Sequence, residues 1–187
     1  MEKQEWRQHF LQARRSLSAL QRISFSAAIH RQVLNHPAWH RARTIGFYFA
    51  FPDEVQTHSL LQSAWKRGKK IAAPVINRWR QNIEFRLLSS IPPWPLPHKQ
   101  MTRLPIMQPL PAERLDLVLV PGVGFDERGI RLGFGKGYYD RFFKSCRAFR
   151  MGLAYESQLT SCLPSREWDV PVDCLITEKR SIVTAPA

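Results

Sequence analysis

The chain opens with two segments whose apolar residues recur at helical spacing. Residues 2–17 predict a first amphipathic helix, whose apolar stripe consists of Trp6, Phe10, Ala13 and Leu17. Ser18, followed three positions later by Gln21, forms a capping box that predicts a second helix through about residue 34. A third helix is predicted over residues 59–67, after the N-cap residue Thr57.

Short runs rich in β-branched and aromatic residues alternate with helices along the rest of the chain. They predict strands at 44–50, 69–73, 83–87, 117–120, 150–155 and 174–177, the last being the expected final strand. The first two strands and the helix between them form a βαβ unit with parallel strands, and Pro74 is expected to close the second strand. This alternation predicts one three-layer α/β domain over residues 1–187, with a mostly parallel sheet flanked by helices.

Prolines concentrate between residues 92 and 111. Half of the 14 prolines in the chain lie there. Because proline lacks a backbone N–H and fixes φ, such density forbids a helix or a central strand. We expect an extended segment over the surface, which is also a candidate substrate lid.

Three glycines at alternate positions follow the predicted 117–120 strand, namely Gly133, Gly135 and Gly137. Without a Cβ, backbone N–H groups there can approach an anion closely, and Arg131 and Lys136 add positive charge. A helix predicted to begin near Gly137 points the positive end of its dipole at this loop. We interpret the segment as a phosphate-binding loop, with the carboxylate of Asp140 beside it as a candidate metal ligand.

Two other phosphate-loop motifs are absent. A Walker A loop needs glycine where Ile130 stands and serine or threonine where Gly137 stands. A dinucleotide fingerprint needs its third glycine where Tyr138 stands. The three glycines alone fit equally well a turn that merely joins a strand to a helix, and the neighbouring charges favour anion binding.

Composition narrows the class of protein and its partners. The chain has 28 Lys and Arg against 15 Asp and Glu, a net charge of +13, which favours nucleotides, polyglutamates or nucleic acid as partners. Lys and Arg form no dense basic tract, and no RNP, KH or zinc-finger pattern occurs, which argues against nucleic acid. There is no membrane-length apolar run, no export signal and no C-x-x-C pair among the three cysteines. We therefore expect a cytoplasmic protein with reduced thiols.

Residues 121–140 read Pro-Gly-x-x-Phe-Asp-x-x-Gly-x-Arg-Leu-Gly-x-Gly-x-Gly-Tyr-Tyr-Asp. This pattern resembles the signature of the 5-formyltetrahydrofolate cyclo-ligase family, also called 5,10-methenyltetrahydrofolate synthetases. The resemblance is good at 1–7, 44–74 and 150–178 and weak over 88–112. It implies a Rossmann-like sheet of the kind seen in sugar-phosphate isomerases and CoA transferases.

The resemblance implies an ATP site formed by the loop and the first helix. Lys3 and Arg7 match the Lys-x-x-x-Arg with which the family opens, and they would reach the phosphates and the substrate; the pattern alone would make them a solvated helix face. The residues implied to bind ATP are Lys3, Arg7, Arg131, Leu132, Gly133, Phe134, Gly135, Lys136, Gly137, Tyr138 and Tyr139. Of these, Lys3, Arg131 and Lys136 are implied to be catalytic, because they would offset charge on the transferred phosphoryl group.

The resemblance also implies a folate site around Glu54. The segment Glu54-Val55-x-Thr57 matches the family's Glu-Val-x-Thr, so Glu54 would hydrogen-bond the pterin ring. On sequence alone, Glu54 lies either in the ligand crevice past a strand end or in an ordinary turn. The residues implied to bind substrate are Arg7, Phe49, Glu54, Gly135, Tyr138 and Tyr139.

A metal site is implied by two carboxylates far apart in sequence. The match of Asp169-x-Pro-x-Asp173 to the family implies that Asp173 helps Asp140 to hold Mg²⁺. Two carboxylates with phosphate oxygens and water make a normal Mg²⁺ shell. The residue pattern by itself favours a turn cap for Asp173.

The implied reaction is phosphorylation of the formyl oxygen of 5-formyltetrahydrofolate by ATP. N10 then closes the ring, and phosphate leaves to give 5,10-methenyltetrahydrofolate and ADP. The chain has no G-x-S-x-G motif and no histidine in the glycine loop, which fits catalysis by positioning and charge neutralisation. The alternatives are a sugar-phosphate isomerase or CoA-transferase-like enzyme, and a basic RNA-binding protein. We expect a monomer, although no residue pattern fixes the oligomeric state or the preferred polyglutamate length.

Overall fold

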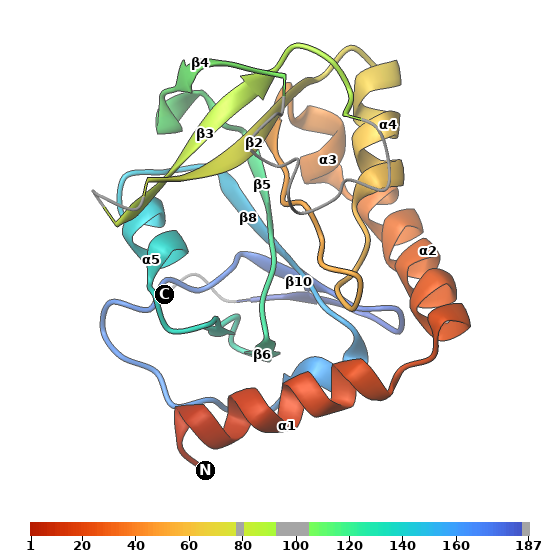
Figure 1. The fold of residues 1–187 in the computed structure, drawn as a ribbon, viewed down its shortest axis with the longest axis vertical. Coiled ribbons are helices and arrows are strands. Elements are labelled where there is room, and N and C mark those ends of the chain that lie inside the picture. The colour runs from red at the N-terminus through yellow and green to blue at the C-terminus, as the bar shows by residue number, and fades with distance from the viewer. Residues whose placement is uncertain (78–80, 93–104, 185–187) are drawn as a thin grey trace.

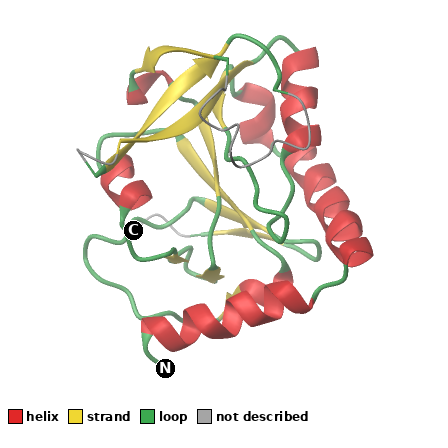
Figure 2. Ribbon diagram, in the orientation of Figure 1, coloured by secondary structure: helices red, strands yellow, loops and turns green. Residues whose placement is uncertain are grey.

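A mixed eight-stranded sheet forms the centre of the computed structural model, which describes residues 1–77, 81–92 and 105–184 (Figures 1 and 2). The strands of this sheet lie in the order β11-β10-β8-β5-β1-β2-β3-β4. Their bounds are β1 Thr44–Gly46, β2 Lys70–Asn77, β3 Asn82–Leu88, β4 Ile106–Leu110, β5 Leu117–Val120, β8 Phe149–Leu153, β10 Cys174–Ile176 and β11 Ser181–Val183. Five adjacent strands, from β10 to β2, are parallel, and the strands outside them pair antiparallel.

Helices cover both faces of this sheet. Those on the faces are α2 Ala19–Asn35, α3 Pro37–Arg41, α4 His58–Lys66 and α5 Tyr138–Phe143, whereas α1 Lys3–Ser16 lies elsewhere. Alternate residues of β5 point to opposite faces: Leu117 and Leu119 join the core under α2, α3 and α4, whereas Val118 and Val120 join the core under α5. The three-layer α/β fold with a mostly parallel sheet is therefore confirmed. No helix in the described part of the chain is long and apolar enough to cross a membrane.

Helix α1 lies across one end of the sheet rather than on a face (Figure 1). Its apolar stripe packs on a second, three-stranded sheet of order β7-β6-β9, formed by Arg131–Leu132, Gly124–Asp126 and Leu159–Thr160. The ring of Phe10 lies so close to Gly124 that an added Cβ there would be 2.2 Å from a ring atom. Only glycine therefore lets the helix approach to this distance.

The first strand is shorter than predicted, and Pro74 explains why. Phe47 N–H donates to the Ala72 carbonyl at 2.9 Å, so the backbone of Pro74, two residues further on, faces the same neighbour. Since proline has no N–H to donate, the β1–β2 ladder ends there. The prediction that Pro74 closes the second strand is wrong, because β2 continues to Asn77 through its pairing with β3.

Other predicted boundaries agree only in part: the strand expected at 150–155 spans Phe149–Leu153, and the helix expected at 59–67 spans His58–Lys66. The strand at 117–120 and the Ser18 capping box are confirmed. The expectation that 174–177 is the final strand is wrong, because β11 returns antiparallel to β10. The three-stranded sheet was not predicted either, since all three of its strands are only two or three residues long. Pro109 lies in β4 at the edge of the main sheet, where proline is tolerated. Most of the candidate lid, 93–104, lies outside the described residues.

Candidate active site

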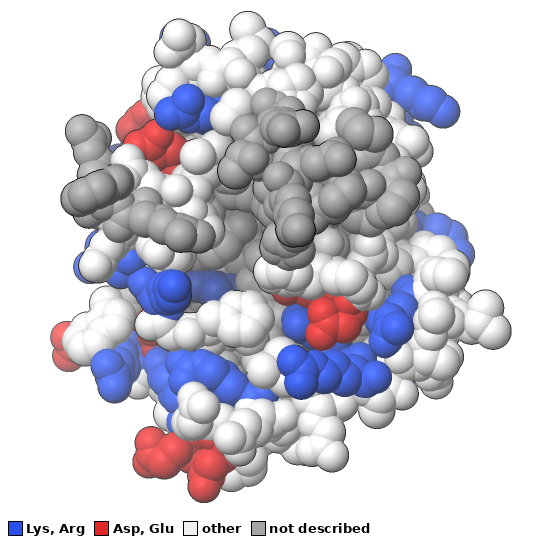
Figure 3. All heavy atoms as spheres, viewed as in Figure 1, with Lys and Arg blue, Asp and Glu red and all other residues white. Residues whose placement is uncertain are grey.

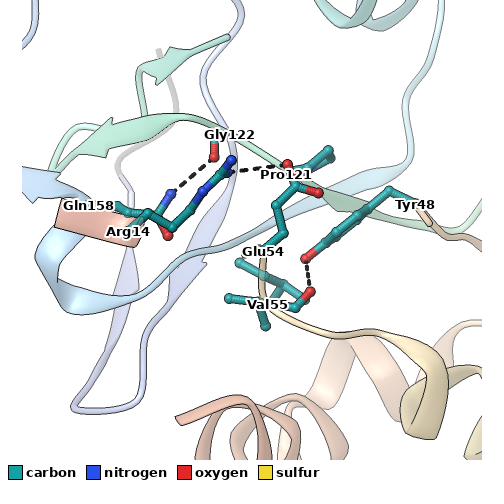
Figure 4. A pocket seen from close by; sticks show the side chains of 8 residues that line it. Arg14, Tyr48, Glu54, Val55, Pro121, Gly122 and Gln158 are labelled. Atoms are coloured by element: carbon teal, nitrogen blue, oxygen red, sulfur yellow. Dashed lines mark hydrogen bonds and ion pairs between the residues drawn. The ribbon is translucent and has the colours of Figure 1, made fainter. Parts of the chain in front are cut away.

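Loops that follow the carboxyl ends of β1, β5 and β8 meet around a narrow space lined by polar side chains (Figure 4). Glu54 follows β1, Gly122 follows β5, and Gln158 follows β8, donating to the carbonyls of Gly122 and Val123 at 3.1 and 2.9 Å. This is the edge of a parallel sheet at which ligands bind in open α/β folds. Glu54 thus lies at this edge, directly after the turn at Pro52 and Asp53, and its role in binding a ligand stays a prediction.

Glu54 is almost enclosed, with 7% of its surface exposed. One carboxylate oxygen accepts from the Phe51 N–H at 3.0 Å, and the other lies 3.3 Å from Nη1 of Arg14. Burial raises the pKa of Glu54, and the Phe51 N–H and Arg14 act against this rise. The carboxylate is thus held in one orientation, with its charge partly compensated.

Arg14 reaches this pocket from α1. Its side chain is 3% exposed and its guanidinium also pairs with Asp53, Nη2 lying 2.9 Å from Oδ2. An unpaired buried charge is strongly unfavourable, so Arg14 can be buried here only because the two carboxylates pair with it. Sequence reasoning missed Arg14; its one signal was a charged residue on the same helix side as Lys3, Arg7 and Phe10, eleven residues after Lys3.

Three tyrosines surround Glu54. Tyr155 donates to the Glu54 carbonyl at 3.0 Å, and Tyr48 donates to the Val55 carbonyl at 2.8 Å. Burial first, and the charge of Glu54 in addition, raise the pKa of both Tyr48 and Tyr139. Tyr139 stands in the first turn of α5, so the end of the glycine loop reaches the pocket. All three hydroxyls stay neutral near pH 7.

The glycine loop lies on the exposed side of the same region. Gly135 and Gly137 have φ values of +90° and +63°, which residues with a Cβ rarely adopt. Phe134, Gly135 and Lys136 are exposed, and 61% of the Phe134 surface is open. Gly137 caps α5, but α5 has only six residues, so its dipole adds less than the sequence suggested. The loop is an open cradle built of backbone.

Helix α1 brings Arg7 to this loop, and its Lys3 pairs with the later segment that contains Asp169. Nε of Arg7 donates to the Gly133 carbonyl at 2.8 Å, and a Cβ on Gly135 would lie 3.3 Å from Nη2 of Arg7. Nζ of Lys3 lies 2.7 Å from Oδ2 of Asp169. Figure 3 shows Lys and Arg side chains gathered on the lower half of this face, over α1 and the neighbouring loop. The reading of Lys3 and Arg7 as a merely solvated edge is not supported.

The remaining loop residues also form definite contacts. Arg131, with 8% of its side chain exposed, pairs with Asp140 at 3.2 Å and lies over the Tyr139 ring. Arg141 lies over the Tyr138 ring and donates to the Lys136 carbonyl at 2.8 Å. Leu132 is buried and supports the loop from below, whereas Phe49 is half-buried at the rim of the main core.

The two carboxylates predicted to share a metal ion are held by different arginines. Asp140 pairs with Arg131 beside the loop, whereas Asp173 precedes β10 and takes three hydrogen bonds from the backbone and side chain of Arg150. Asp169, four residues earlier, is the carboxylate that contacts Lys3. A shared site of Asp140 and Asp173 stays a prediction, and Asp169, which pairs with Lys3 of α1, is another candidate for the second carboxylate.

The carboxylates near the glycine loop suit a Mg²⁺ ion only if a nucleotide supplies further ligands. The residues that the structure describes contain no group of three or more His, Cys, Asp or Glu side chains able to hold a metal. Mg²⁺ accepts one or two carboxylates when phosphate oxygens and water complete its shell. The donors around the glycine loop therefore fit a metal that arrives with a nucleotide rather than a resident ion.

An exposed glycine loop and a buried carboxylate at the carboxyl edge of a mostly parallel sheet are typical of a Rossmann-like α/β enzyme. Comparison with known families refines this class. The model of the 5-formyltetrahydrofolate cyclo-ligase family matches residues 1–178, and the chain belongs to this family of ligases.

Individual relatives agree with this assignment over nearly the whole chain. A 5-formyltetrahydrofolate cyclo-ligase of Haemophilus influenzae is 32% identical over 91% of this chain and 94% of its own length. A mouse protein of the same name is 31% identical over 88% and 87%. The 5,10-methenyltetrahydrofolate synthetase of Aquifex aeolicus has a TM-score of 0.82 at 30% identity, covering 100% of this chain and 95% of that one.

Proposed function

We propose that this protein converts 5-formyltetrahydrofolate to 5,10-methenyltetrahydrofolate, with ATP hydrolysed to ADP and phosphate. The observation that carries the proposal is a single helix, α1, which contacts the exposed glycine loop at one end and the Glu54 pocket at the other. A reaction between a nucleotide and a bicyclic ring needs two such adjoining sites. Family membership favours this reaction over an isomerase, a CoA transferase or an RNA-binding protein.

The loop would hold ATP through its backbone and three side chains. The N–H groups of Gly133, Gly135 and Gly137 have no Cβ beside them and suit phosphate oxygens. Arg7, Lys3 and Lys136 would balance the phosphate charge, and Arg131 would orient Asp140 from below. Asp140 and a second carboxylate would hold Mg²⁺, which would supply positive charge to offset that of the phosphates.

The pocket would hold the folate ring. The Glu54 carboxylate accepts hydrogen bonds, so it suits the N–H groups of an aminopyrimidinone ring, and Phe49, Tyr138 and Tyr139 offer aromatic surface beside it. With both substrates bound, the formyl oxygen attacks the γ-phosphorus and ADP leaves. N10 then attacks the formyl carbon, its proton is lost, and phosphate departs with the former formyl oxygen.

The test is the ATP-dependent appearance of the methenyl chromophore with 5-formyltetrahydrofolate as the only organic substrate. We expect product formation that requires both ATP and Mg²⁺ and releases one ADP per turnover. Product formed at the same rate without ATP would contradict the proposed role of ATP. Absence of product with both substrates and Mg²⁺ present would contradict the proposal.

A further inference from the structure

Arg14 lies in the pocket in a way that packing alone does not explain. It extends from the last turn and a half of α1, is 2% exposed, and contacts both Asp53 and Glu54. Its neighbour Arg15 on the same helix is exposed. Burying a guanidinium costs free energy, which is offset only where its hydrogen bonds are well directed. Here the hydrogen bonds of Arg14 fix the carboxylates of Asp53 and Glu54, which lie in one loop.

The charged and titratable groups around Glu54 come from every element that packs on it. They are Arg14 from α1, Asp53 from its own loop, Tyr48 after β1, Tyr139 from α5 and Tyr155 after β8. Arg14 is the single cation among these groups. The Phe51 N–H contact is local to the loop, so Arg14 alone ties the carboxylate to α1.

We propose that Arg14 is a positioning residue that fixes the Glu54 carboxylate in its ionised, acceptor form for the ring of the substrate. The inference rests on the proposed function, because it takes Glu54 as the ring-binding group. Arg14 and Lys3 are eleven residues apart on one helix, about 16 Å along its axis. The helix that presents cations to the phosphate loop thus also sets the ring-binding carboxylate.

The experiment compares Arg14→Gln, Arg14→Lys and the control Arg15→Gln by steady-state kinetics. We expect Arg14→Gln to raise the KM for 5-formyltetrahydrofolate about tenfold, the loss of one charged hydrogen bond, while the KM for ATP stays within about twofold. Arg14→Lys keeps the charge and should restore part of the affinity. Arg15→Gln should match the wild type. A purely structural role would raise both KM values together.

The pH profile gives a second readout. Burial raises the pKa of Glu54 and Arg14 lowers it, so removing Arg14 should raise this pKa further. The Glu54 carboxylate then takes up a proton at higher pH. The acid limb of kcat/KM for the folate should therefore move to higher pH in Arg14→Gln. In a Glu54→Gln background, the Arg14 change should move no limb. An acid limb that stays in place in Arg14→Gln would overturn the inference.

If Arg14→Gln does not fold, Asp53→Asn serves in its place, because it removes the other anchor of the guanidinium and leaves Glu54 intact. We expect a smaller rise in the folate KM, about threefold, with the ATP KM unchanged. An unchanged folate KM there would contradict the inference. Wild-type protein without ATP-dependent activity would instead overturn the proposed function itself, so the two failures are distinct.

Discussion

The two ends of α1 contact regions of opposite character. The glycine loop is exposed. Its candidate ligand groups are backbone N–H groups, flanked by long cationic side chains such as Lys136. The Glu54 pocket is enclosed, and its groups are side chains from five segments that hold one another in place. The comparison indicates that charge can be bound at an open surface, whereas a ring is recognised by polar groups whose orientation is fixed before it arrives.

The largest effect should come from the enclosed region. Glu54→Gln replaces an acceptor carboxylate with an amide that offers one acceptor, so kcat/KM for 5-formyltetrahydrofolate should fall about 100-fold. ATP binding, measured by calorimetry without folate, should change less than about twofold. An equal loss of ATP affinity would show that the two regions do not act separately.

A second prediction concerns the carboxylates that would hold Mg²⁺ beside the glycine loop. Asp140→Asn and Asp169→Asn should each raise the Mg²⁺ concentration for half-maximal turnover about tenfold, and the double variant should lose less than the sum of the two free-energy changes. Asp173→Asn, whose carboxylate is held by Arg150, should need wild-type Mg²⁺. If instead Asp173→Asn raises the requirement and Asp169→Asn does not, the original pairing with Asp140 is right.

The open region should respond to backbone strain. Gly135→Ala places a Cβ at φ +90° and 3.3 Å from Arg7, so ATP affinity should fall about tenfold while the free energy of unfolding changes by about 1 kcal/mol. Gly68→Ala is the matched control, because Gly68 has φ +68° with nothing within 4 Å and lies after α4. Equal ATP affinity in both variants would remove the support for a phosphate loop.

The smallest effect is expected at the point where the regions meet. Tyr139→Phe removes a hydroxyl whose pKa is raised by burial, so the group stays protonated and does not exchange protons in the working pH range. The ring packs against Phe143 and under Arg131, and phenylalanine keeps both contacts. We expect kcat within about threefold of wild type. A loss of 100-fold or more would indicate a direct catalytic role.

Sequence reasoning reached the open region more fully than the enclosed one. Glycines, charges and a strand end are local signals, so the loop followed from short patterns, whereas the approach of Arg7 to it followed only from the family resemblance. Sequence patterns did not predict the contacts of Arg14, Gln158 and Asp169, because the partners of these residues lie 40, 36 and 166 residues away. The early end of β1 escaped for a related reason: it depends on Pro74 in the neighbouring strand. Long-range pairing is what periodicity does not encode.

The position of α1 has a consequence for how the chain folds. This helix precedes its partners Gly124, Gly133 and Asp169 by more than 110 residues along the chain. The apolar stripe of α1 can therefore pack only after these later segments have folded, and its docking closes very long loops. We expect α1 to be the element that detaches most readily from the native state. Amide hydrogen exchange over Lys3–Ser16 should then be faster than in β5, and should slow when both substrates are bound. Exchange in α1 as slow as in β5 in the free protein would contradict this order of docking.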